Sequence, residues 1–146
     1  MPEKETLRRA AKDKAEGKSP STQAGEFVHE EIEHIREGKH GARSTKQAIA
    51  IGLSKARRAG VKLPPPKEGQ ASEETREQAA RDVRKAKAGT KTSAKRSRAT
   101  SRALKREGHK AASKVALSSH ARSVAAKRSA ASRSRSAKKA AATRKK

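Results

Sequence analysis

The sequence predicts a mostly α-helical protein with extensive disorder, made of a small helical hairpin and a tail rich in Lys, Arg, Ala and Ser. Bulky apolar residues recur at helical spacing mainly in residues 23–63. Leu, Ile, Val and Phe together number 15 in a chain of 146 residues. At a formal net charge of +24, so low an apolar content is typical of disordered chains. We therefore expect most of the protein to be unfolded alone.

The charge is divided unevenly between two parts of the chain. Residues 1–82 hold 17 Lys and Arg against 14 Asp and Glu, a net charge of +3. Residues 83–146 hold 22 Lys and Arg against one acid, Glu107, a net charge of +21. This difference indicates two halves with different functions.

Glycine, proline and capping residues divide the chain further. A first helix over residues 3–16 has a thin apolar face that includes Leu7 and Ala10. The predicted segments are 1–22, a basic helix and linker; 23–63, the helical hairpin; 64–71, a Pro-rich hinge; 72–89, a marginal helix; and 90–146, a basic low-complexity tail.

The hairpin is the best-defined element. Its first helix, over residues 23–37, carries an apolar stripe of Phe27, Val28, Ile32 and Ile35. Its second helix begins at Ser44 and Gln47, which have the spacing of a capping box. We expect the two helices to run antiparallel and to bury that stripe against Ile49, Leu53 and Val61. This core is very small, so a homodimer through the hairpin, with Ile51 as a second contact, would stabilise it.

The stretch from Gly25 to Gly60 resembles a family of small, basic bacterial proteins. The shared segment has the form S-x-K-Q-A-I-A-I-x-L-S-x-A-R-x-A-G and begins here at Ser44. The resemblance covers about residues 24–66 and implies a bacterial origin and a domain of unknown function. In composition, the tail is similar to those of bacterial linker-histone-like proteins, although it lacks their proline.

The tail predicts binding to the phosphate backbone of a nucleic acid. Closely spaced cations beside a polyanion release condensed counterions, a term that does not depend on base sequence. Solubility alone requires a smaller charge of one sign. The residues that we expect to bind phosphate are Lys95, Arg96, Arg98, Arg102, Lys105, Arg106, Lys127, Arg128, Arg133, Arg135, Lys138, Lys139, Arg144, Lys145 and Lys146. Dense like charge opposes a helix in the free tail, whereas its 17 alanines after residue 82 favour one on binding.

Aromatic content favours duplex over single-stranded nucleic acid. Phe27 is the only aromatic residue, and its place on the apolar stripe assigns it to the core, so no platform exists for stacking unpaired bases. A helix-turn-helix reader is an alternative, with Lys46, Lys55, Arg57 and Arg58 on phosphates. The connection over residues 38–43 is longer than the usual turn of such readers.

The sequence contains no pattern typical of an enzyme. His29, Glu30 and His34 form H-E-x-x-x-H, one residue longer than the zinc-protease motif, so the two histidines point away from each other around a helix. There is no cysteine, and no phosphate-binding glycine loop or nucleophile motif is present. We expect no catalysis, no metal and no cofactor.

These observations predict a sequence-tolerant, histone-like, nucleoid-associated DNA-binding protein that binds duplex DNA through its backbone. Two alternatives stay open: an RNA-associated basic protein, and an adaptor whose hairpin binds a protein partner. Because no apolar run approaches the length of a membrane span, we expect no membrane partner and a cytoplasmic, nucleoid location.

Overall fold

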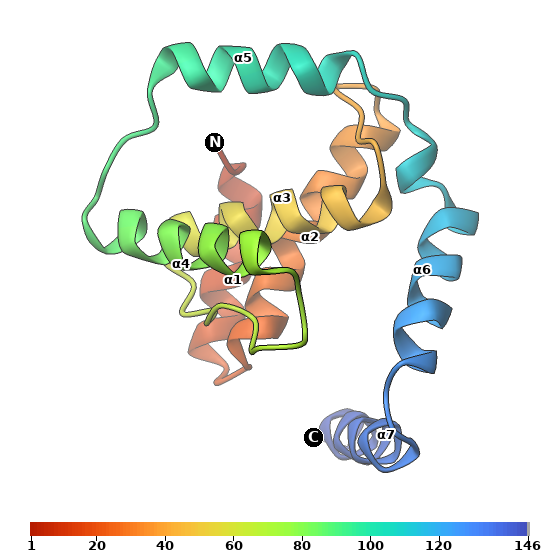
Figure 1. The fold of residues 1–146 in the computed structure, drawn as a ribbon. Coiled ribbons are helices and arrows are strands. Elements are labelled where there is room, and N and C mark those ends of the chain that lie inside the picture. Colours follow the sequence, from red (N-terminus) through yellow and green to blue (C-terminus); the bar gives the residue numbers. More distant parts are fainter. Residues whose placement is uncertain (146) are drawn as a thin grey trace.

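The computed structural model describes residues 1–145, and most of them are helical (Figure 1). The elements are α1 (Lys4–Ala15), α2 (Pro20–Arg36), α3 (Thr45–Arg58), α4 (Glu73–Lys87), α5 (Ala94–Lys105), the short 3₁₀-helix η1 (Lys110–Ala112), α6 (Lys114–Ala126) and α7 (Ala130–Arg144). Helices α1 to α4 pack together, and α5, α6 and α7 follow one another around them (Figure 1). None of these helices is both long enough and apolar enough to cross a membrane.

The prediction of extensive disorder was wrong. Residues 94–145, called the arm from here on, form α5, η1, α6 and α7, joined by short connections. Alanine favours these helices, and serine hydroxyls cap two of them. Ser113 Oγ accepts a hydrogen bond from Ala116 N at 3.1 Å, and Ser129 Oγ accepts one from Ser132 N at 3.2 Å. The cations lie on exposed helix faces, where water and salt screen the repulsion that the sequence reading overestimated.

Serine caps also define the first half of the chain. Ser44 Oγ accepts a hydrogen bond from Gln47 N at 3.2 Å, so the predicted N-cap of α3 is confirmed. Helix α2 begins at Pro20, before the predicted residue 23, with Ser19 as its N-cap. The sequence analysis placed Ser19 and Pro20 in a linker. A capping serine followed by proline is, however, a common way to begin a helix.

The core consists of two small apolar clusters between α2 and its neighbours. One contains Ile32, Ile35, Ala42, Ala48, Ala111 and Ala112, with Val28 and Leu117 packed against it. The other contains Ala10, Ala24, Phe27 and Ala56, with Leu53, Val61 and Leu63 packed against it. The predicted apolar stripe of α2 is therefore buried, but its partners come from the whole chain and not from α3 alone.

Helix α3 faces α2 with small residues. Ala48 and Ala56 are fully buried, and a Cβ on Gly52 between them would lie 2.7 Å from Val28 Cα. The predicted role of Ile49 was wrong, because this residue is half-buried and belongs to neither cluster. Large side chains on this face would hold the two helix backbones apart.

Helix α1 also turns a different face inward from the one predicted. Leu7 is 42% exposed, whereas Thr6, Ala10 and Asp13 are buried. Ala10 alone joins the apolar cluster beside Phe27. The apolar stripe of α1 predicted the wrong buried face, because polar residues occupy most of the α1 face that contacts α2.

The arm is fastened to the connection between α2 and α3 by backbone hydrogen bonds. Gly41 N donates to Leu104 O at 2.9 Å, and Ala42 N donates to Gly108 O at 3.0 Å. Thr45 Oγ1 adds a buried hydrogen bond to Ala111 O at 2.7 Å. Residues 104–117 of the supposed tail are thus part of the folded core.

Gly52→Ala tests the close approach of α2 and α3. The new methyl group would overlap the backbone of Val28 and Phe27, so we expect the free energy of unfolding to fall by about 1–3 kcal/mol. Gly25→Ala is the matched control, because a Cβ on this α2 residue meets nothing within 4 Å. It should stabilise the protein by about 0.5–1 kcal/mol through helix propensity. Urea denaturation followed by circular dichroism measures both, and equal effects would contradict the packing.

Gly41→Ala tests the attachment of the arm. A Cβ on Gly41 would overlap the backbone carbonyl of Glu107, whereas a Cβ on Gly108 meets nothing within 4 Å. We expect Gly41→Ala to speed amide hydrogen exchange in residues 104–117 with little change in α1, because the methyl group breaks only this junction. Gly108→Ala should leave exchange in both regions as in the wild type. Unchanged protection in Gly41→Ala would show that the arm is not held there.

Candidate functional site

The predicted phosphate-binding residues lie on the surface of the arm. All fourteen of them within residues 1–145 are exposed, and the fifteenth, Lys146, lies outside the described residues. Helices α5, α6 and α7 bury no residue of their own. These side chains are therefore free to meet a large partner.

Helix α5 gathers its cations on one face. At about 100° per residue around an α-helix, Lys95, Arg98, Arg102 and Lys105 fall within a quarter to a third of the circumference. We call these four residues the α5 stripe. Arg96 lies to one side of it. The sequence reading identified the residues but not their common face, because it treated the segment as disordered.

Helix α7 does not form one basic face. Arg135, Lys138 and Lys139 lie on one side of the helix, while Arg133 and Arg144 lie on the opposite side, at the same rotation per residue. Alanine, serine and one threonine fill the remaining positions. A flat partner could contact only part of this set at once.

The arm's cations have no acidic partners. Within residues 1–145, every side-chain ion pair closer than 4.0 Å joins residues between Glu3 and Asp82. Arg128 is held instead by hydroxyls, donating to Ser132 Oγ at 3.1 Å and Ser136 Oγ at 2.5 Å. Most acids of the first half pair with cations of the same half, which leaves the positive charge of the arm uncompensated.

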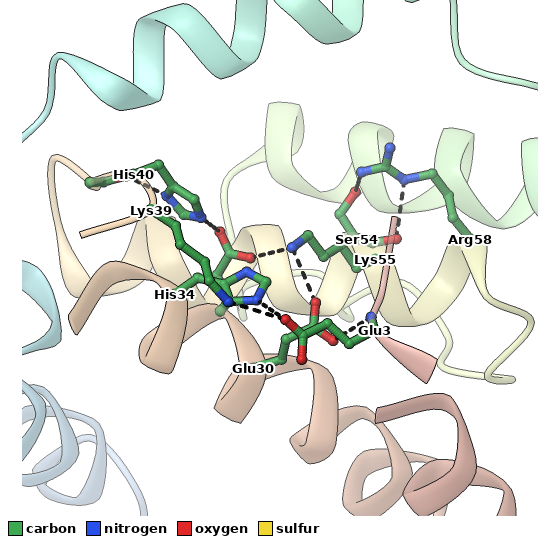
Figure 2. A network of polar contacts seen from close by, with 10 residues as sticks. Glu3, Glu30, His34, Lys39, His40, Ser54, Lys55 and Arg58 are labelled. Carbon is green, nitrogen blue, oxygen red and sulfur yellow. Dashed lines mark hydrogen bonds and ion pairs between the residues drawn. The ribbon is translucent and has the colours of Figure 1, made fainter. Parts of the chain in front are cut away.

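A second polar feature lies between α2 and α3 (Figure 2). Glu30 and Glu31 of α2 are 4% and 0% exposed. Lys55 of α3 lies between them, with its Nζ 2.6 Å from Glu31 Oε2 and 3.5 Å from Glu30 Oε1. One ammonium group therefore pairs with two buried carboxylates. These ion pairs hold α2 and α3 together in addition to their packing.

The N-terminus closes one side of this network. Glu3 N donates to Glu30 Oε2 at 3.0 Å, and Glu3 Oε1 lies 2.8 Å from His34 Nε2. Burial raises the pKa of Glu30, but hydrogen bonds from the Thr6 hydroxyl and the Glu3 N–H outweigh it, so the pKa is lowered. Hydrogen bonds from His34 and then Lys39 likewise lower the pKa of the Glu3 carboxyl. Both groups are therefore held as carboxylates.

His40 closes the other side. Its Nε2 lies 3.1 Å from Glu31 Oε1, and its Nδ1 lies 3.0 Å from Gly41 O. Gly38, at φ 75°, takes the left-handed conformation in which glycine turns the chain after α2. The turn brings His40 back over the helix, beside the network.

This grouping of histidines was missed by the sequence reading. It considered His29 with His34, whereas His29 is exposed, and His34 lies with His40 and Glu31. The i, i+3 spacing of Glu31 and His34 places both on one helix face. The position of His40 could not be read from spacing, because it depends on the turn at Gly38.

Helix α4 is joined to α3 by a smaller polar contact, also drawn in Figure 2. Ser54 Oγ donates to Asp82 Oδ2 at 2.5 Å, and Arg58 Nε lies 3.8 Å from Asp82 Oδ1. Asp82 is 3% exposed. The helix predicted as marginal is therefore held in place by a buried carboxylate.

Comparison with known proteins identifies one segment. Residues 14–67 match a family described as a family of unknown function, DUF6496. The match spans α2 and α3 and confirms the domain of unknown function that the resemblance indicated. No curated protein and no solved structure shows significant similarity to this chain.

Lys55→Met tests the buried network. Removing the ammonium leaves the carboxylates of Glu30 and Glu31 without their shared counter-charge, so we expect a loss of about 3–5 kcal/mol in unfolding free energy. Lys46→Met is the control, since Lys46 is an exposed residue of the same helix. It should change stability by less than about 0.5 kcal/mol. Similar losses in the two variants, measured by urea denaturation, would contradict a structural role for the ion pairs.

Proposed function

We propose that the protein binds duplex DNA through the phosphate backbone, with little dependence on base sequence, and uses the arm to do so. The observation that supports this most is the unpaired charge of the arm. The arm holds 17 Lys and Arg against one acid, Glu107, a net charge of +16, and the predicted binding residues among 1–145 are exposed. Such a surface next to DNA gains free energy by counterion release.

The α5 stripe fits the spacing of a duplex. Lys95 and Lys105 are ten positions apart, or about 15 Å along a helix axis. One strand of DNA places a phosphate about every 3.4 Å along the duplex axis, so about four phosphates of each strand fall within this axial length. The stripe presents four cations to them.

The core supports duplex binding over base stacking. Phe27 is 1% exposed and packs beside Ala10, Ala24 and Ala56. A buried ring cannot stack on an unpaired base. The duplex is therefore favoured over a single strand.

The alternative helix-turn-helix reading loses support from the same geometry. Lys55 pairs with buried carboxylates, and Arg57 donates to the carbonyls of Leu63 and Pro64. Arg58 donates to Ser54 Oγ and lies near Asp82. Of the four basic α3 residues considered for phosphate contacts, only Lys46 is exposed and without such a role.

A salt titration of DNA affinity tests the proposal on the full chain. Log K should fall linearly with log[salt] between roughly 50 and 200 mM, with a slope of about −0.9 per phosphate neutralised. Replacing Lys95, Arg98 and Arg102 together by Gln should make the slope shallower by up to about 2.7. It should also weaken A·T-rich and G·C-rich duplexes alike, because phosphate contacts carry no base information.

A control of equal charge separates the arm from net charge. Lys4, Lys14 and Lys46 are exposed cations of the first half, and changing all three to Gln should leave the slope nearly unaltered. A loss as large as that of the α5 stripe variant would show that only net charge matters. Tighter binding of duplex RNA of the same length, at the same salt, would assign the arm to RNA instead.

A further inference from the structure

Three possible metal ligands converge beside the α2–α3 core. One ligand atom from each of Glu31, His34 and His40 lies within 4.8 Å of the other two. The set is partly sheltered, with the Glu31 side chain 1% exposed and the His34 and His40 side chains 14% and 16% exposed. Two imidazoles and a carboxylate form a donor set that Zn²⁺ commonly takes in proteins.

The carboxylate of Glu31 is incompletely satisfied. Both of its oxygens are buried, and neither accepts a hydrogen bond of good geometry, although Lys55 Nζ and His40 Nε2 lie close enough for ion pairing. Glu30 and Glu31 together bring two negative charges, and Lys55 brings one positive charge to both. Counted over these three side chains the net charge is −1, which one more cation would neutralise.

The orientation of His40 shows where that cation fits. Its Nδ1 faces Gly41 O at 3.0 Å, and a ring nitrogen facing a carbonyl must donate its hydrogen. The other ring nitrogen, Nε2, faces Glu31 Oε1 at 3.1 Å. A backbone carbonyl on the far ring nitrogen is also the usual support of a metal-binding histidine.

We propose that Glu31 Oε1, His34 and His40 bind a divalent transition-metal ion, with Zn²⁺ as the best match. At a tetrahedral angle, ligand distances of about 2.0–2.2 Å place two ligands of one Zn²⁺ ion about 3.3–3.6 Å apart. The ligand atoms lie within 4.8 Å of one another, so at its widest the cluster must contract by up to roughly 1.2–1.5 Å, which rotation of the three side chains can supply. Lys55 stays on the other oxygen of Glu31, and Glu3 adds a carboxylate 2.8 Å from His34 Nε2.

The site joins α2 to the attachment of the arm. Glu31 and His34 lie on α2, whereas His40 directly precedes Gly41 and Ala42, whose N–H groups donate to Leu104 and Gly108. A bound ion would hold this connection against α2. Metal binding should therefore stabilise the junction of core and arm, independently of whether the arm binds DNA.

Isothermal titration of the full chain with Zn²⁺ tests this site. We expect one ion per chain, with the affinity falling at least tenfold in His34→Gln and in His40→Gln. His29→Gln is the matched control, because His29 is an exposed residue of α2, and it should bind as the wild type does. No uptake by the wild type, or an equal loss in His29→Gln, overturns the proposal.

Imidazole ¹⁵N spectra test the metal site in the wild type, so the result does not depend on whether a variant folds. Addition of Zn²⁺ should shift the ring nitrogens of His34 and His40 and leave those of His29, His109 and His120 in place. Shifts spread over all five histidines would indicate weak surface binding and overturn the site.

Discussion

The close approach of α2 and α3 is the constraint on which the rest of the structure depends. Gly52 lets the backbone of α3 reach that of α2 at Val28, and the neighbouring alanines of α3 are buried against it. This contact places Lys55 beside the carboxylates of α2. It also defines the connection that receives the arm. A chain with 15 large aliphatic and aromatic residues can fold here because small residues bring backbone atoms into contact, where dispersion adds to limited apolar burial.

Buried charge supplements this small core at a cost. Desolvating Glu30, Glu31 and Lys55 offsets much of their attraction, so the network contributes less to stability than its distances suggest. It does make one arrangement of the helices better than others, because a shift of α3 along α2 would leave carboxylates unpaired. Helix register is thus defined by charge where apolar side chains are too few to define it.

Charge segregation connects the fold to the proposed function. Acidic residues are concentrated before residue 83 and pair there with local cations, whereas the arm has almost none. The arm is nevertheless an ordered part of the molecule, since Ala111, Ala112 and Leu117 belong to the core. Its cations are therefore presented on short helices of defined direction, which costs less ordering entropy on binding than an unfolded tail would.

The sequence by itself determined the local features: the capped start of α3 at Ser44, the presence of a helix within residues 72–89, the burial of Phe27 and the uneven charge. Each depends on neighbouring residues or on composition, and physical rules for caps, helix periodicity and charge apply to it directly. Only the tertiary structure decided that the arm is ordered, that Lys55 pairs with two buried carboxylates, and that His40 meets Glu31 and His34. These features arise from contacts between distant segments, as in the 66-residue separation of Thr45 and Ala111. Alanine and glycine mark such contacts only weakly in a sequence, because their small size matters only once another backbone lies against them.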